Sequence, residues 1–243
     1  MALASIVRRF GNKLYEHAFP LYRPLYAAYK AYSDCGEREL LKQVLNPGCI
    51  VVDAGANIGI YSEFLSRRVG PTGIVHSFEP SPDNFNRLRA ATRNLSNVRL
   101  NQLAVSDKTG ESLLYLSNNL NVDHRVYPNE GETRRTLSIR SIRLDDYFKP
   151  GERVDLVKMD LQGFELHALQ GINRVVADNP DIKLLLEFCP YALNQAGASG
   201  NDLLTALREK GMMIQKVSSK GLIPLLPDWM SERPGWYVNL FAS

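Results

Sequence analysis

The chain has 243 residues, of which 44% are hydrophobic and 23% are charged. This balance predicts a globular fold with one large domain, or one domain with an appendage, and excludes whole-chain disorder, collagen and coiled coil. No apolar run approaches the ~18–20 residues of a membrane span, and the first residues lack the pattern of a secretory signal. Three widely spaced cysteines without a C-x-x-C motif indicate reduced thiols and a cytoplasmic location; they are Cys35, Cys49 and Cys189.

The net charge of +3 is unevenly distributed along the chain. Residues 1–32 carry five basic residues against one acidic residue, whereas the rest carries 24 basic against 25 acidic residues. The body of the chain is therefore neutral, which argues against a nucleic-acid partner. Tyr22, Tyr26 and Tyr29 share one face of a helix. We expect residues 1–40 to form a helical arm that packs on a domain of residues 41–243 or covers its substrate. A membrane-surface helix is less favoured because the positive charges are dilute.

From residue 40 onward, short apolar runs alternate with helical patterns. This alternation predicts an α/β fold, with a parallel sheet, right-handed crossovers and helices on both faces. Strands are expected at 49–55, 73–80, 97–107, 154–160, 182–188, 212–218 and 236–242, and helices at 60–70, 82–94, 163–172 and 201–210.

The connection between Asp107 and Val154 is longer than a simple crossover requires. Strand-like alternation at 111–117 and 136–144 flanks a polar stretch, residues 118–135. Loops of this length are usually functional or disordered. We therefore expect an inserted strand–loop–strand flap, at about residues 108–150, over the carboxyl edge of the sheet.

The run VVDAGANIG, residues 51–59, carries the strongest chemical signal. A buried strand ends at Asp53, and Gly55 and Gly59 follow before a helix begins, which lets backbone N–H groups approach a ligand closely. The third glycine of a dinucleotide fingerprint is missing, and an acid at Asp53 suits a cationic ammonium and ribose hydroxyls better than a pyrophosphate. Glu79 ends the next strand, 24 residues after Gly55, where an acid typically accepts hydrogen bonds from a ribose.

Five ordered motifs then resemble one known family. They are D-x-G-A-N-I-G-x-Y-S, V-x-S-F-E-P-x-P-x-N, A-V-S-D, K-M-D-L-Q-G-F-E-x-x-x-L-x-G and L-L-L-E-F, between about Val51 and Phe188. Together they resemble the FkbM-type S-adenosylmethionine-dependent methyltransferases. The resemblance implies a Rossmann-like sheet of seven strands and methylation of hydroxyls on macrolides and sugars. Gln162 departs from the glutamate that many relatives carry.

The resemblance also implies residue roles around S-adenosyl-L-methionine. Asp53, Gly55, Asn57 and Gly59 would surround its methionine part, and Glu79 would hold its ribose. The backbone from Gln102 to Ala104 would border the adenine.

Three residues are candidates for the chemistry of the acceptor. Asp160 and Glu187 end the fourth and fifth strands, so they share a rim with Asp53. We expect Asp160 to face the sulfonium methyl, although it could instead cap the following helix. His124, between Asp123 and Arg125 in the flap, is the best neutral-pH base among four histidines. No spacing typical of metal ligands occurs, so no metal is expected.

The sequence therefore predicts an O-methyltransferase that acts on a small-molecule hydroxyl, such as that of a polyketide, a sugar or a related metabolite. N-methylation and a non-catalytic cofactor-binding protein remain open alternatives. A nicotinamide dehydrogenase is not favoured, because the sequence lacks the glycine fingerprint that binds a pyrophosphate. Nucleic-acid methylation is not favoured either, because the body of the chain is not basic and contains no N-P-P-Y type motif. The sequence leaves the oligomeric state and the exact acceptor open.

Overall fold

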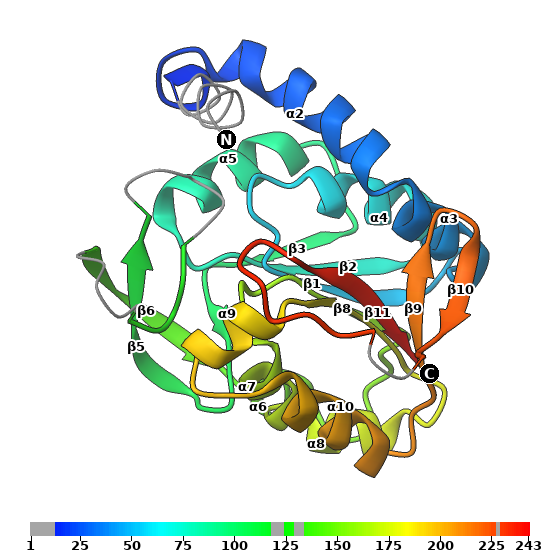
Figure 1. Ribbon diagram of the computed structural model, residues 1–243. Coiled ribbons are helices and arrows are strands. Elements are labelled where there is room, and N and C mark those ends of the chain that lie inside the picture. The colour runs from blue at the N-terminus through cyan, green and yellow to red at the C-terminus, as the bar shows by residue number, and fades with distance from the viewer. Residues whose placement is uncertain (1–12, 118–123, 129–133, 227–228) are drawn as a thin grey trace.

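The computed structural model describes residues 13–117, 124–128, 134–226 and 229–243. Its centre is an eight-stranded sheet in the order β10-β9-β11-β8-β7-β1-β2-β3 (Figure 1). Strands β3, β2, β1, β7 and β8 run parallel, β11 is antiparallel to both of its neighbours, and β10 is antiparallel to β9. The strands are β1 Ile50–Ala54, β2 Ile74–Phe78, β3 Val98–Asn101, β7 Leu156–Met159, β8 Lys183–Phe188, β9 Ile214–Ser218, β10 Gly221–Pro224 and β11 Val238–Ala242.

The predicted α/β fold is confirmed, with three local differences. The sheet was predicted to be parallel, but it is mixed, because β11 and β10 pair antiparallel with their neighbours. The sheet has an eighth strand, β10, which the sequence did not indicate because Pro224 lies in it. Proline is tolerated there because β10 is an edge strand. The predicted strand 97–107 is divided into β3 and a separate β4, Ala104–Val105. Strand β4 leaves the main sheet and joins a second sheet.

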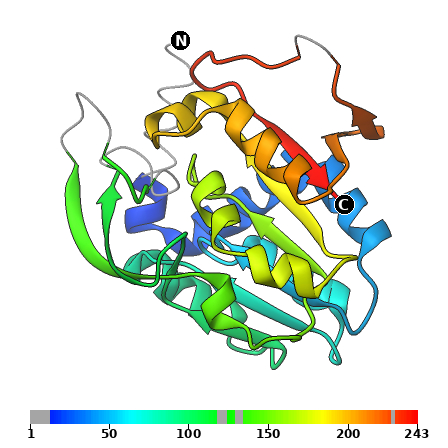
Figure 2. The same ribbon diagram turned by 90° about the horizontal axis from the view of Figure 1, so that it is seen from below.

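The second sheet contains the inserted segment. It has the order β4-β6-β5, with β5 at Gly110–Leu116 and β6 at Arg135–Ile142. Strands β5 and β6 pair antiparallel along their whole length and stand beside one end of the main sheet (Figures 1 and 2). Much of the loop between them, including Asp123, lies outside the described residues.

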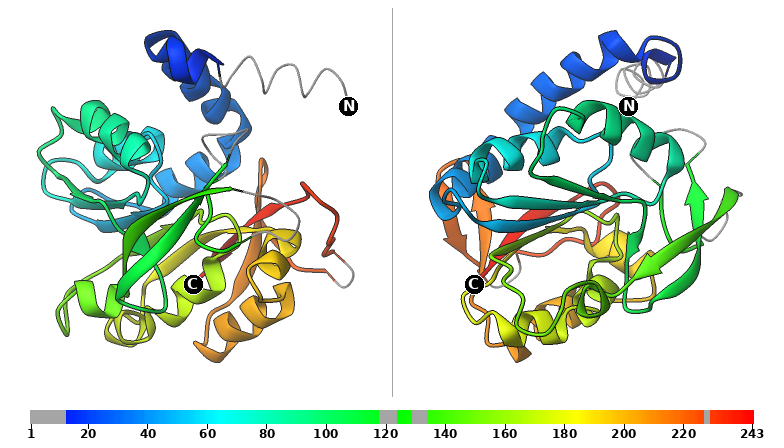
Figure 3. Two further views of the ribbon diagram at one scale, coloured as in Figure 1. Left: turned by 90° about the vertical axis from the view of Figure 1, so that its left-hand side faces the viewer. Right: turned by 180° about the vertical axis from the view of Figure 1, so that it is seen from behind.

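Helices cover both faces of the main sheet, as predicted (Figures 1 and 3). One face carries α2 Phe19–Ser33, α3 Cys35–Val44, α4 Ile60–Val69 and α5 Pro82–Thr92. The other carries α6 Leu144–Tyr147, α7 Glu165–Gln170, α8 Asn173–Asp178, α9 Pro190–Gln195 and α10 Gly200–Glu209. Helices α6, α8 and α9 have only four to six residues, too few for a periodic pattern to reveal them.

Burial on both faces explains the continuous apolar strands. Val51 packs with the cluster under α3 and α4, whereas its neighbour Val52 packs with the cluster under α7 and α10. Successive side chains of a strand point to opposite faces, so a central strand covered twice is largely apolar. Polar exceptions such as Asp53, Ser77 and Lys158 lie in the carboxyl-terminal halves of their strands.

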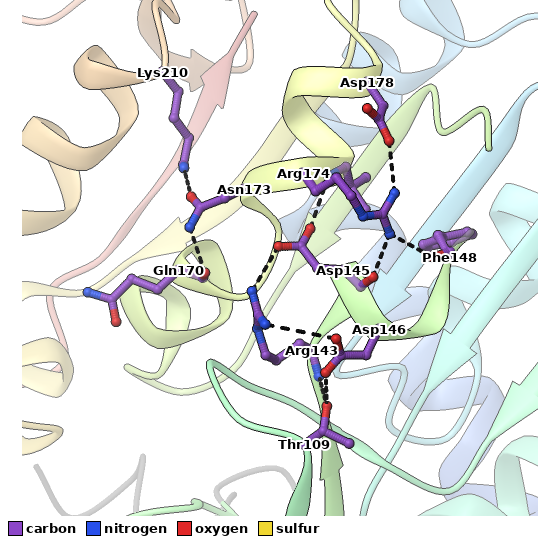
Figure 4. A network of polar contacts seen from close by, with 11 residues as sticks. Thr109, Arg143, Asp145, Asp146, Phe148, Gln170, Asn173, Arg174, Asp178 and Lys210 are labelled. Atoms are coloured by element: carbon purple, nitrogen blue, oxygen red, sulfur yellow. Dashed lines mark hydrogen bonds and ion pairs between the residues drawn. The ribbon is translucent and has the colours of Figure 1, made fainter. Parts of the chain in front are cut away.

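A polar network fixes the base of the inserted segment (Figure 4). The Asp145 carboxylate accepts hydrogen bonds from the Arg143 side chain and from the backbone N–H of Val175, both at 3.0 Å. The Arg174 guanidinium donates to the Asp178 carboxylate at 2.8 Å and to the carbonyl oxygen of Phe148 at 2.6 Å. The network therefore joins the end of β6 to α6 and α8 and anchors the base of the inserted segment to the main domain.

The N-terminal arm packs on α4 and α5. Tyr22 is buried, and the guanidinium of Arg87 lies 3.4 Å from the centre of the Tyr15 ring. Arg23 forms a 2.6 Å ion pair with Glu63 of α4. Within the described ranges, no helix combines the length and the apolar character needed to cross a bilayer.

Candidate functional site

A cavity of about 300 Å³ opens at the carboxyl end of the parallel strands. Its wall combines the segments after β1, β2 and β7 and the end of β8 with residues from α2, from the inserted segment and from the stretch before β11. The charged or histidine side chains in the wall are Lys30, Glu79, His124, Lys158, Asp160 and Glu187. Most residues predicted for the site therefore meet in one place.

The turn after β1 forms one side of this cavity. Gly55 has a φ of +82°, and an added Cβ would overlap the carbonyl oxygen of Asp160. The backbone N–H groups of Gly55 and Ala56 donate to the carbonyl oxygen of Phe78 at 3.0 and 2.9 Å. Gly59, with a φ of +87°, begins α4 against Leu88. Glycine is thus required at both positions, by the backbone conformation and by close packing.

Glu79 lies at the end of β2 and is only 5% exposed. Its carboxylate accepts hydrogen bonds from the backbone N–H groups of Asn57 and Ser81, both at 2.9 Å. Burial raises its pKa to about 7, although these hydrogen bonds oppose the shift. Glu79 therefore faces the cavity and also ties the turn after β1 to the end of β2.

Asp53 does not contribute to the cavity wall. Its side chain is fully buried behind the turn, where it accepts a hydrogen bond from the hydroxyl of Ser62 at 2.7 Å. The ammonium of Lys158 lies 3.8 Å from its other oxygen. Burial raises the pKa of Asp53. Lys158 thus stands between this carboxyl and the cavity.

The segment predicted to border the adenine is partly in the wall. Leu103 and Ala104 line the cavity, whereas the Gln102 side chain is exposed and outside it. The break between β3 and β4 produces this difference, because the backbone turns toward the second sheet at residues 102–103. A role for Gln102 would have to rest on its backbone groups.

An acidic corner lies opposite the turn. The Gln162 side-chain amide donates to the Asp160 carboxylate at 3.0 Å and to the Glu187 carboxylate at 3.4 Å. The ammonium of Lys158 is 3.8 Å from Asp160. Burial, together with the negative charges of Asp160 and Glu165, raises the pKa of Glu187 well above its ordinary value. The structure therefore brings Asp160 and Glu187 together around one amide.

His124 reaches the cavity from the inserted segment. Its Nδ1 accepts a hydrogen bond from the backbone N–H of Ser117 at 3.1 Å. Because a backbone N–H can only donate, the neutral ring must carry its proton on Nε2. In this arrangement His124 offers a donor to a ligand, and it could accept a proton only after giving up the bond to Ser117.

The sequence did not point to several wall residues. Tyr26, Tyr29 and Lys30 extend from α2, and the spacing of the tyrosines was the only signal for them. Burial would lower the pKa of Lys30, but the charges of Asp160, Tyr26 and Asp34 outweigh it and raise that pKa. Further wall residues are Tyr61, Lys158 and Tyr237. Among the described residues, no group of three or more histidine, cysteine or acidic side chains is arranged to hold a metal ion.

Comparison with known proteins agrees with this architecture. The family model described as "Methyltransferase FkbM domain" matches residues 53–212. The methyltransferase sdnD of Sordaria araneosa is 26% identical in an alignment 189 residues long, and the match covers 60% of this chain and 73% of sdnD. The 2-O-methyltransferase NoeI of Sinorhizobium fredii is 28% identical in an alignment 152 residues long, and the match covers 55% of this chain and 61% of NoeI.

A solved structure shows the same fold. The crystal structure of methyltransferase FkbM from Methylobacillus flagellatus superposes with a TM-score of 0.52 at 18% identity. The match covers 91% of this chain but 54% of that protein. This chain thus spans about half the length of that structure.

Proposed function

Because this chain belongs to the FkbM methyltransferase family, we propose that it transfers a methyl group from S-adenosyl-L-methionine to a hydroxyl oxygen of a small-molecule acceptor. Polyketides, sugars and related metabolites are the proposed acceptor class. The free cysteines among the described residues accord with a cytoplasmic site of action. When bound, the cofactor supplies a methyl group that its sulfonium has already activated.

One buried oxygen in the cavity wall, which has no hydrogen-bond partner, is the main support for the cofactor assignment. The Asn57 side-chain oxygen is buried and has no hydrogen-bond partner, and Asn57 lines the cavity with a φ of +50°. An unsatisfied buried acceptor costs about 1–3 kcal/mol. An ammonium group is a suitable donor for this oxygen, and the methionine part of the cofactor contains one. The residues of the turn thus fit the proposed ligand.

Glu79 supports the same assignment. Its carboxylate accepts two backbone hydrogen bonds and one from the Asn84 side chain, which leaves one of about four acceptor positions for a ligand. A ribose hydroxyl would supply the donor for it. We assign this role to Glu79, and we propose that Ala104 and the backbone near Gln102 border the base.

The chain's own contribution to the reaction is positioning and proton uptake. Correct alignment of two reactants can supply up to ~7–11 kcal/mol, and a positioned base adds roughly 10²–10⁴-fold. The acceptor oxygen uses its electron pair for the new C–O bond, the C–S bond breaks with its pair left on sulfur, and the hydroxyl proton passes to a base. We propose Asp160 as this base, because it lines the cavity with a 31% exposed side chain.

The test is transfer of isotope-labelled methyl to panels of polyols, macrolides and primary amines, with the product analysed by NMR. The proposal predicts methyl signals on oxygen in at least one hydroxyl acceptor. Exclusive labelling of amines would show N-methylation instead. Cofactor binding without transfer to any member would favour a non-catalytic role.

A further inference from the structure

The turn between β7 and α7 holds a side chain in an unusual backbone conformation. Gln162 has a φ of +55°, in the left-handed region, and a non-glycine residue pays of order 1 kcal/mol or more to adopt it. The turn is fixed by its neighbours. Glu165 accepts the backbone N–H of Leu161 at 2.7 Å, and the Tyr127 hydroxyl donates to the carbonyl oxygen of Gln162. The surrounding structure therefore determines where the Gln162 side chain lies.

That side chain bridges the two carboxyl groups of the acidic corner. Its Nε2 atom is 3.0 Å from an Asp160 oxygen and 3.4 Å from a Glu187 oxygen. A primary amide has two N–H donors, so one nitrogen can serve both acids. All three residues line the cavity, which places the bridge in contact with whatever ligand occupies this end.

The surroundings of the bridge distinguish the two acids. Asp160 has the Lys158 ammonium at 3.8 Å and a side chain that is 31% exposed. Glu187 is half-buried; desolvation and the negative charges of Asp160 and Glu165 outweigh the positive charges of Lys30 and Lys158 and raise its pKa. The other titratable groups that interact with Glu187 are Cys189 and Tyr237.

We propose that Gln162 is a positioning residue whose neutral amide ties Asp160 and Glu187 into one hydrogen-bonded pair, and that it thereby sets the charge at the acceptor end of the cavity. The inference rests on the proposed methyl transfer. The amide thus holds the two carboxyl groups side by side, and the raised pKa of Glu187 favours its protonated form. A neutral hydroxyl can lose its proton to the Asp160 carboxylate, because the Gln162 amide keeps that side chain in place.

A third carboxyl at this position would place another negative charge beside Asp160 and Glu187. Like charges at close range raise the pKa of neighbouring carboxyl groups. Gln162→Glu introduces that carboxyl with little change in size. Gln162→Gly removes the amide and suits the left-handed backbone, so the turn is expected to survive. The matched control is Gln43→Glu, because Gln43 is exposed on α3 and outside the cavity wall.

The first measurement is a carboxyl titration by NMR on the full chain labelled with ¹³C at glutamate and aspartate side chains, with Glu187→Gln used to assign the Glu187 signal. We expect Gln162→Glu to raise the apparent pKa of Glu187 by about 1 unit or more, Gln162→Gly to raise it by less, and Gln43→Glu to leave it unchanged. Identical titration curves in Gln162→Glu and the parent would overturn the proposal.

The second measurement separates this inference from the proposed function. Gln162→Gly should lower kcat about 10-fold with S-adenosylhomocysteine affinity unchanged, and the acid limb of the kcat profile of Gln162→Glu should move to higher pH. A parent protein that neither binds S-adenosylhomocysteine nor transfers methyl would refute the proposed function. The NMR titration alone would then test whether Gln162 bridges the two acids. An active enzyme whose kcat is the same with and without the Gln162 amide would refute the inference and leave the function intact.

Discussion

Glu79 combines a structural and a binding role in one side chain. Its carboxylate holds two backbone N–H groups and still faces the cavity. Substitution by alanine would therefore leave both N–H groups unsatisfied. A loss of ligand affinity could then not be separated from a loss of stability. Glutamine keeps the shape and one acceptor oxygen and removes the charge, so only one of the two backbone N–H groups loses its partner.

We expect Glu79→Gln to weaken S-adenosylhomocysteine binding by roughly 10–100-fold, because hydrogen bonds to a charged group contribute about 1.5–3 kcal/mol. Calorimetry measures the affinity, and urea unfolding checks the fold. Glu209→Gln, at an exposed site on α10, is the control. If Glu79→Gln binds as tightly as the parent, the ribose role is wrong.

A variant of His124 tests whether the inserted segment contributes to turnover. Since His124 lines the cavity but comes from a segment remote from the cofactor motifs, His124→Ala should lower kcat roughly 10-fold through loss of a hydrogen-bond donor to the acceptor and leave cofactor affinity nearly unchanged. His17→Ala is the control, because the His17 side chain is 78% exposed. Unchanged turnover would reduce this segment to a connector. An equal fall in cofactor affinity would place it over the cofactor.

At the level of elements, the contact between the turn after β1 and the end of β7 holds the two halves of the site together. Gly55 touches the backbone of Asp160 so closely that no side chain fits between them. Gly151 offers a matched comparison, because its φ is also positive, at +75°, but nothing lies within 4 Å of its would-be Cβ.

Gly55→Ala should therefore abolish cofactor binding and destabilise the fold, whereas Gly151→Ala should cost only the backbone strain, about 1 kcal/mol. Urea unfolding and calorimetry on both variants check this. Equal losses of stability in the two variants would show that the clash with Asp160 is relieved by a small movement and that the turn is adaptable.

At the level of the whole molecule, a buried acid links stability to pH. Burial raises the pKa of Glu165 from 4.5 to about 7, and its side chain lies under the turn of residues 160–164. The unfolded chain releases this proton near pH 4.5, while the folded chain keeps it until about pH 7. The folded state therefore binds more protons in this window, and its free energy of unfolding falls as the pH rises.

Glu165→Gln removes this titration, so the stability of the parent relative to the variant should fall by about 2–3 kcal/mol between pH 4.5 and 7.5. Urea unfolding of both proteins across that range measures the difference. Parallel stability curves for the two proteins would contradict a raised pKa for Glu165.

The sequence predicted where most strands lie along the chain and which edge of the sheet carries the site, because apolar runs and glycine turns are local signals. It could not predict which face of a strand end a side chain takes, and Asp53 accordingly lies behind the turn and not in the cavity wall. Lys30 was missed because its contact with the site depends on how α2 packs. Gln162 was noticed only as a departure from a motif, since its bridge requires residues 25 positions apart.

The most direct test of the central claim is calorimetry of the parent protein with S-adenosylhomocysteine, with NADH as the comparison ligand. The account predicts micromolar binding of S-adenosylhomocysteine at one site, weakened in Glu79→Gln and lost in Gly55→Ala, and no binding of NADH. Binding of NADH without binding of S-adenosylhomocysteine would contradict it.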